Sequence, residues 1–196
     1  MDCSKIGRLI AGLRTEMGLT QKDVADGLGI SNKTVSKWEC GLGCPDLSLW
    51  PDLSAMLGAD MNQLMDGEIT PNRPDSGNIA KLRFYVCPSC GNILFSTGGA
   101  SVFCCGRKLE PLTLAEGDLP HVTVQEVDFE YYVTIDHDMR KDHYLSFAAY
   151  VKSDGVYLHR FYPEQAAAVR LPYLRGGQLY FYCVRHGLYR SPLDFS

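Results

Sequence analysis

Four cysteines between residues 87 and 105 have the side-chain type and spacing of metal ligands. Cys87 and Cys90 form a Cys-x-x-Cys pair, and the adjacent Cys104 and Cys105 follow after thirteen intervening residues. A Cys-x-x-Cys pair folds a tight loop round one ion, and four thiolates make a tetrahedral sulfur site that suits zinc or iron. Neighbouring residues of a regular strand point to opposite faces, so Cys104 and Cys105 can share an ion only if the backbone turns between them. Gly106 directly afterwards agrees with such a turn.

Histidines and one further cysteine offer a second set of ligands. The chain contains five histidines, of which His186 ends the stretch Cys183-Val-Arg-His186. The other four are His121, His137, His143 and His159. Each taken alone is most simply a polar residue of a β-rich region that binds no ion. Several imidazoles with one thiolate, however, suit iron or another first-row transition metal.

Composition limits the class of protein. Eight cysteines and a formal net charge of −4 occur in a chain with 45% hydrophobic residues. The polar start MDCSKIGRLIAGLR does not resemble a secretory signal peptide, and no apolar run reaches the ~20 residues that span a bilayer. We therefore expect a cytoplasmic protein with no membrane partner. In that compartment cysteines favour metal binding or redox chemistry over structural disulfides.

The elements that must position these residues fall into three segments. Residues 1–67 have helical apolar spacing, with Ile6, Leu9, Ile10 and Leu13 on one face. Residues 68–81 are rich in Gly, Pro, Asn and Ser and predict a linker. From Leu82 onward short β-type runs alternate with turn signals, which predicts an all-β sandwich. The expected fold is thus multidomain, all-α and then all-β.

The first segment has the spacing of a helix-turn-helix. The stretch GLTQKDVADGLGISNKTVSKWECGLGCPDLSLW resembles the phage-repressor type of helix-turn-helix domain, the xenobiotic-response-element family, over residues 4–66. The resemblance implies five helices and a homodimer that binds an operator in double-stranded DNA. The DNA contacts that we expect are Gln21, Asn32, Lys33, Ser36 and Lys37. A helical interaction module is the alternative, because residues 1–70 carry six Lys and Arg against ten Asp and Glu, and phosphate contacts need cations.

The cysteine-rich segment YVCPSCGNILFSTGGASVFCCGRKLEPL is similar to desulforedoxin, a small iron–tetrathiolate module. The shared features are the CxxC…CC-G pattern, the preceding aromatic strand and the CGN sequence. The resemblance implies a small β module in which Cys87, Cys90, Cys104 and Cys105 bind iron. Structural zinc at the same four thiolates remains the alternative.

Three stretches in the last segment, LPHVTV, IDHDMRKDHYL and YCVRHGLY, resemble the iron-binding domain of desulfoferrodoxin, in the superoxide reductase family. The two resemblances together cover about residues 82–196, and they imply a small metal module over 82–112 and an iron-binding sandwich over 113–196. The second resemblance implies an immunoglobulin-like β-sandwich and a ferrous site that reduces superoxide to hydrogen peroxide, re-reduced by a rubredoxin-like electron donor. The implied ligands are four imidazoles and one axial thiolate, from His121, His137, His143, His186 and Cys183. His159 matches no ligand position.

Two departures from the family pattern bear on activity. The family has Glu-Lys before the first ligand histidine, where this chain has Leu119 and Pro120, and a proline where this chain has Asp138. Lys141, in the same loop, is a candidate to replace the lost charge. The leading hypothesis is a DNA-binding enzyme of the superoxide reductase type. The alternatives are a transcriptional regulator that senses redox state or iron, with little turnover, and a dimeric regulator stapled by structural metals.

Overall fold

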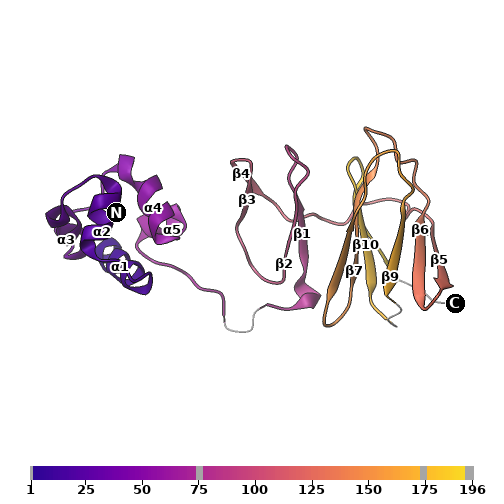
Figure 1. Cartoon of the computed structure of the whole chain (residues 1–196), viewed down its shortest axis with the longest axis horizontal. Coiled ribbons are helices and arrows are strands. Elements are labelled where there is room, and N and C mark those ends of the chain that lie inside the picture. The colour runs from indigo at the N-terminus through magenta and orange to yellow at the C-terminus, as the bar shows by residue number, and fades with distance from the viewer. Residues whose placement is uncertain (1, 74–76, 173–175, 193–196) are drawn as a thin grey trace. The chain divides into compact units, whose positions relative to one another are not determined.

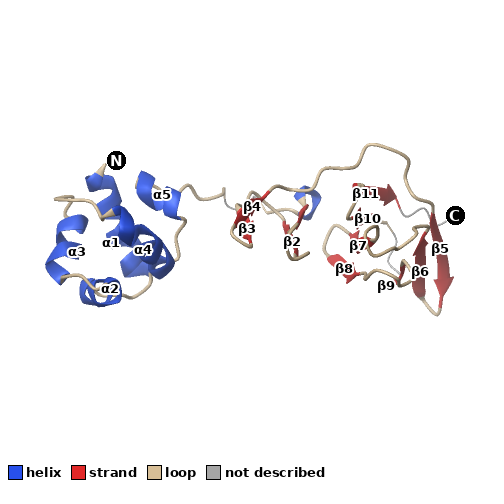
Figure 2. Cartoon of the chain, turned by 90° about the horizontal axis from the view of Figure 1, so that it is seen from above, coloured by secondary structure: helices blue, strands red, loops and turns tan. Residues whose placement is uncertain are grey.

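A computed structural model describes residues 2–73, 77–172 and 176–192 (Figure 1). The chain divides into two compact units, one ending at Pro71 and the other beginning at Asn72. This division lies within the predicted linker 68–81, of which residues 74–76 are outside the described part of the chain. Helices fill the N-terminal unit and strands dominate the C-terminal unit (Figure 2). No helix in the described ranges is long and apolar enough to cross a membrane.

The described part of the N-terminal unit contains five α-helices and one 3₁₀ turn. They are α1 (Cys3–Glu16), α2 (Gln21–Leu28), α3 (Asn32–Glu39), η1 (Leu47–Leu49), α4 (Trp50–Leu57) and α5 (Met61–Asp66). Polar side chains accept hydrogen bonds from free backbone N–H groups at the helix starts: Thr20 and Asp23 form a capping box on α2, and Ser31 caps α3. The five helices expected from the sequence are confirmed.

The core of this unit depends on a close approach of α1 to α3. Val35 and Trp38 of α3 are buried against Ile6 and Ile10 of α1. At Gly7 an added Cβ atom would lie 1.9 Å from the Trp38 carbonyl oxygen, so only glycine permits the two backbones to meet. The contact fixes α3 on α1 and leaves the opposite face of α3 towards solvent.

The C-terminal unit begins with two small hairpins that follow the 3₁₀ turn η2 (Ile79–Lys81). Strands β1 (Arg83–Val86) and β2 (Ile93–Ser96) pair antiparallel, as do β3 (Val102–Cys104) and β4 (Arg107–Leu109). The remaining strands form two antiparallel sheets. One has the order β11-β10-β7-β8 and the other β5-β6-β9. Their bounds are β5 (Val122–Val127), β6 (Glu130–Ile135), β7 (Leu145–Val151), β8 (Val156–Arg160), β9 (Ala168–Pro172), β10 (Gln178–Cys183) and β11 (Gly187–Pro192).

Strand β7 lies at the centre of this unit, because every one of its residues is buried. On one face, Leu145 and Tyr150 belong to a core shared with residues of β6, β9 and β10, so the two sheets pack on each other. On the other face, Phe147 packs against Phe84 of β1, with ring centroids 5.2 Å apart. The cysteine-bearing hairpins are therefore docked on the back of the four-stranded sheet through Phe84.

One feature differs from the expectations above. Cys3 and Cys44 form a disulfide, although the sequence favoured metal or redox chemistry over structural disulfides. The fold brings their Cα atoms to 5.0 Å, which is within the range that a disulfide spans. Residues 173–175 and 193–196 of the predicted sandwich lie outside the described residues.

Replacement of Gly7 by alanine tests the α1–α3 contact. The Cβ atom of Gly7→Ala meets backbone that cannot rotate away, so we expect a loss of about 1–3 kcal/mol from the free energy of unfolding of the N-terminal unit. Gly12→Ala is the matched control, because nothing lies within 4 Å of its added Cβ. In urea unfolding, Gly12→Ala should equal or exceed the wild type in stability. Equal effects of the two substitutions would contradict the close approach.

Candidate metal centres and nucleic-acid interface

The four clustered cysteines converge from two hairpins. Cys87 follows β1, Cys90 lies in the turn before β2, and Cys104 ends β3 beside Cys105. Their sulfur atoms all lie within 4.8 Å of one another. Cys105 has a left-handed backbone with φ of 50°, and Gly106 continues it with φ of 72°. Positive φ is uncommon for a residue with a side chain, and here it supplies the turn that lets adjacent cysteines face one point.

The cluster favours ionisation of one thiol and opposes ionisation of another. The Cys90 and Ser89 backbone N–H groups donate to the Cys87 sulfur and lower the pKa of its thiol to about 6. Sulfur atoms of Cys90, Cys87 and Cys104 crowd Cys105 and raise the pKa of its thiol to about 12. Four thiolates therefore repel one another without a cation, and a bound metal ion that replaces their protons stabilises all four.

The second group forms where two loops meet at one end of the sheets. His137 and His143 lie on the loop between β6 and β7, Cys183 ends β10, and His186 lies in the turn before β11. One ligand atom from each of these four residues lies within 4.8 Å of the others. The His143 Nε2 and His186 Nδ1 atoms are 3.3 Å apart, and the Cys183 Sγ atom is 3.8 Å from the same His186 atom.

Backbone irregularities aim these side chains. The register between β7 and β10 shifts between Tyr182 and Cys183, so Cys183 pairs with Leu145 after a local irregularity that changes the direction of the strand beside the loop. In that loop Met139 adopts φ of 47°, is buried, and accepts the Leu145 N–H at its sulfur atom, 3.3 Å away. The methionine thus anchors the loop between the two histidines.

The residues present fit a transition-metal ion. The His137 side chain is 5% exposed, and its Nε2 atom has no hydrogen-bond partner among the described residues. Burial lowers the pKa of His137, which favours the neutral imidazole that metals bind. The Arg185 N–H donates to the Cys183 sulfur at 3.5 Å, which stabilises a thiolate. A metal ion would satisfy the unpaired nitrogen and the buried sulfur together.

His121 is the expected ligand that the structure does not bring into this group. Its backbone carbonyl accepts from the Asp136 N–H at 2.9 Å, so the two chain segments touch. Its ring, however, is exposed and lies beside Thr123, with Nδ1 3.4 Å from the hydroxyl oxygen. The fifth ligand therefore stays a prediction. His159 lies exposed on β8 against Phe161, in keeping with its exclusion from the ligand set.

The positions that depart from the family pattern are also placed. Leu119 is exposed and Pro120 half-buried, and neither side chain can donate a proton. Lys141 is exposed and pairs with Glu164, with 3.8 Å between nitrogen and oxygen. Its role as a replacement charge is not shown by this geometry and stays a prediction.

Asp138 has a role that sequence reasoning missed. One carboxylate oxygen lies 2.8 Å from His143 Nδ1, and the other lies 2.8 Å from Arg140 Nε. Partial desolvation raises the pKa of Asp138, but the charge of Arg140 and the contacts with His143 outweigh it and lower the pKa overall. The His143 Nδ1 atom has no partner of hydrogen-bond geometry among the described residues, so the carboxylate acts through its charge, which favours a proton on Nδ1 and leaves Nε2, which faces His186, for a metal. The only signal in the sequence was an acidic residue directly after His137.

The expected DNA-reading face lies on α3. Asn32, Lys33 and Lys37 are exposed and Ser36 is half-buried. Gln21 is engaged inside the unit, since its amide nitrogen donates to Glu39 at 2.7 Å. The contacts of these five side chains with DNA stay predictions.

Glu39 links the three helices of the motif. It accepts hydrogen bonds from Arg14 at 2.6 and 3.1 Å and from Gln21. Burial raises the pKa of Glu39, yet these hydrogen bonds outweigh burial and hold the pKa below its usual value. The carboxylate thus holds α1 and the start of α2 against the end of α3.

Replacement of Asp138 by asparagine tests its positioning role. Loss of the charge frees the His143 ring, so we expect cobalt(II) affinity at the histidine–cysteine group to fall about 10–100-fold. The measurement is a cobalt titration that follows the thiolate absorption band missing from Cys183→Ser. Asp142→Asn, an exposed residue of the same loop, is the matched control and should bind as the wild type does. Unchanged affinity in Asp138→Asn would show that the carboxylate does not orient His143.

Comparisons with known proteins cover the two units separately. Residues 10–64 match the helix-turn-helix family model. The HTH-type transcriptional activator BcrR of Enterococcus faecalis is 31% identical over 71 residues, which are 36% of this chain and 35% of that protein. The chain thus spans about a third of the length of this curated relative. The family match and this relative agree on a helix-turn-helix in the N-terminal unit.

Solved structures similar to this chain include two superoxide reductases. The enzyme from Treponema pallidum has a TM-score of 0.48 at 21% identity, covering 56% of this chain and 96% of that chain. The enzyme from Nanoarchaeum equitans has a TM-score of 0.28 at 19% identity. The match covers 40% of this chain and 95% of that chain. Such loose superpositions decide neither fold nor activity, so the metal centres are judged by their own ligands. Here a helix-turn-helix unit precedes a β unit with two candidate metal-binding groups.

Proposed function

We propose that this chain is a DNA-binding iron protein that reduces superoxide to hydrogen peroxide. The observation that carries the proposal is the group formed by His137, His143, His186 and Cys183 at the meeting of two loops. Three imidazoles beside one buried thiolate are a ligand set for a redox-active first-row metal. His121 completes the set as a fourth imidazole when its exposed ring turns inward, in an immunoglobulin-like arrangement of the two sheets.

Ferrous iron in this site would supply one electron and a net positive charge that attracts a small anion. The chain's own residues hold and tune the site. Cys183 is fully buried while His186 is exposed, so one side of the group is shielded and the other is open to water. A small anion can therefore enter past His186 without any movement of the core.

Two cations of the loop between β6 and β7 are engaged in ion pairs. Arg140 is paired with Asp138, and Lys141 with Glu164, so the attraction of these two charges for an anion is partly cancelled. Leu119 and Pro120 cannot hold a proton for the product. The two protons of hydrogen peroxide then come from water at the open side. We expect turnover to be slower than at a site where these two cations are unpaired, because electrostatic steering contributes about 10–10³-fold to association rates.

The cysteine cluster is proposed as a second iron site, with zinc as the alternative at the same four sulfurs. A rubredoxin-like protein is the proposed external electron donor. The helix-turn-helix unit is proposed to bind an operator as a homodimer, since one copy carries few cations.

Superoxide reduction is tested with the iron-loaded protein, an electron donor and a pulse of superoxide. Reduction yields one hydrogen peroxide for each superoxide consumed, whereas dismutation yields one for every two. We expect the first ratio, and a loss of at least about tenfold in rate for His186→Ala, because a missing ligand weakens metal binding by that order. His159→Ala is the control, a histidine of the same unit outside the group. A rate no faster than that of free iron would contradict the proposal.

DNA contact is tested at the exposed face of α3. Lys33→Ala should weaken binding to an operator about 5–150-fold, as loss of a base contact costs about 1–3 kcal/mol. Lys108→Ala, an exposed lysine of the C-terminal unit, should leave affinity unchanged. Loss of affinity in both variants, or in neither, would argue against the assignment of α3 as the recognition helix.

A transcriptional regulator that senses redox state is the second candidate function. The observation that favours it is the pairing of Arg140 with Asp138 and of Lys141 with Glu164, which weakens the attraction of a small anion and suits occasional oxidation better than rapid turnover. Its test is DNA affinity in reduced, oxidised and metal-free protein. Sensing requires that DNA affinity differ several-fold between these states. Equal affinities would exclude the sensor and leave superoxide reduction as the one proposed function.

A further inference from the structure

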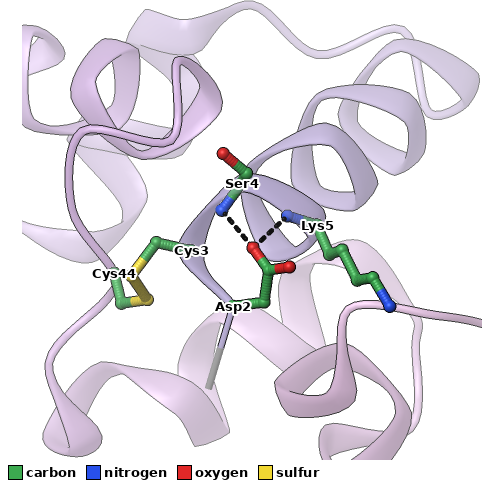
Figure 3. Close-up of a disulfide and its surroundings, with 5 residues drawn as sticks. All are labelled: Asp2, Cys3, Ser4, Lys5 and Cys44. Carbon is green, nitrogen blue, oxygen red and sulfur yellow. Dashed lines mark hydrogen bonds between the residues drawn. A yellow bond between two sulfur atoms is a disulfide. The ribbon is translucent and has the colours of Figure 1, made fainter.

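The disulfide between Cys3 and Cys44 closes the helix-turn-helix on itself. Cys3 is the first residue of α1, beside the capping Asp2, and Cys44 lies in the segment between α3 and η1 (Figure 3). The two cysteines are 41 positions apart, and α1, α2 and α3 lie between them. The bond therefore joins the start of α1 to the chain just after the recognition helix.

Non-covalent contacts bring the same two segments together without the bond. Asp2 caps α1 through hydrogen bonds from the Ser4 and Lys5 N–H groups at 3.0 and 3.2 Å. Gly41 packs on Ser4 so closely that an added Cβ would lie 2.6 Å from its hydroxyl oxygen. Glu39 adds the ion pair with Arg14. A reduced chain would thus keep both thiols close, which is the condition for a bond that can open and close again.

We propose that Cys3 and Cys44 are a reversible thiol–disulfide site for which hydrogen peroxide is the oxidant. A DNA reader works in a compartment whose small thiols keep most cysteines reduced, so a disulfide there is a redox-sensing rather than a permanent bond. One thiolate attacks the peroxide oxygen, forming a sulfenic acid and releasing water. The second thiol condenses with it, forming the S–S bond and a second water. Two thiols lose two electrons, and the peroxide gains them.

The state of this bond changes the stability of the folded unit that carries α3. A closed bond restricts the unfolded chain over the whole helix-turn-helix and so stabilises the folded unit. Cys3 and Cys44 are each partly exposed, which gives a small oxidant access. Cys40, at the end of α3, is an exposed free thiol four positions before Cys44. The fold thus pairs Cys3 with Cys44 and not with Cys40, although Cys40 is the closer of the two to α3 along the chain.

The site needs no metal ion, so it goes beyond the proposed reduction of superoxide and stands without it. The proposed reduction of superoxide could also supply the oxidant for this site, since hydrogen peroxide is its product. The experiment therefore supplies hydrogen peroxide directly, to zinc-loaded full-length protein, because zinc has no redox chemistry of its own. Failure of superoxide turnover would leave its outcome untouched.

Fully reduced protein is treated with one equivalent of hydrogen peroxide, and the linked peptides are identified by mass spectrometry. Unfolding is followed by tryptophan fluorescence, because the chain's two tryptophans, Trp38 and Trp50, both lie in the core of the N-terminal unit. We expect a Cys3–Cys44 link, its removal by a dithiol, and a thermal midpoint at least about 8 °C higher in the linked form.

Cys40→Ser is the matched control and should form the link and show the same shift. Cys3→Ser and Cys44→Ser should show neither, with midpoints equal to that of the reduced wild type. If either variant fails to fold, the comparison of reduced and oxidised wild type still decides. Links through Cys40, both thiols left free, a link that a dithiol does not reopen, or equal midpoints in the two states would each overturn the proposal.

Discussion

Pairing of β10 with β7 is the constraint on which the histidine–cysteine group depends. Strand β7 is buried on both faces, so it fixes the positions of the loops at its two ends. The loop that leads into β7 carries His137 and His143, and β10 beside it ends at Cys183. The register shifts at that last position, where Cys183 pairs with Leu145 at the start of β7, so the thiol lies beside the loop that leads into β7. The same strand carries Phe147, on which the cysteine hairpins dock through Phe84. One buried strand thus positions one metal-binding group and supports the other.

The helical unit depends on close backbone contact and one carboxylate. Gly7 lets α1 touch α3, and Glu39 holds Arg14 and Gln21. These interactions use polar groups inside the unit and leave one face of α3 exposed. The unit carries few cations, which is the reason why DNA binding by two copies is proposed.

Local chemistry explains what could be predicted from the sequence. Helix caps such as Thr20 and Ser31 act within four residues of chain, and alternating aromatic runs form strands wherever they occur. The turn at Cys105 followed from the requirement that adjacent cysteines face one ion. The gathering of His137, His143, His186 and Cys183 was expected only through a resemblance, because no local rule joins residues over 40 positions apart. The Cys3–Cys44 bond was missed for the same reason, because only the fold brings these two cysteines near each other. Asp138 lies five positions before His143, but its role depends on the orientation of that ring, which no sequence pattern encodes. Whether the His121 ring joins the ligand set depends on a side-chain rotation, and no sequence pattern encodes such a rotation.

Each chain is proposed to hold two metal ions, one among four cysteines and one at the histidine–cysteine group. Metal content and the visible spectrum of protein purified without air distinguish this arrangement from a single metal site. We expect two ions per chain, iron at the histidine–cysteine group, and a thiolate-to-iron band that disappears in Cys183→Ser while the other ion remains. A single ion per chain, with a spectrum unchanged by Cys183→Ser, would rule out the histidine–cysteine site.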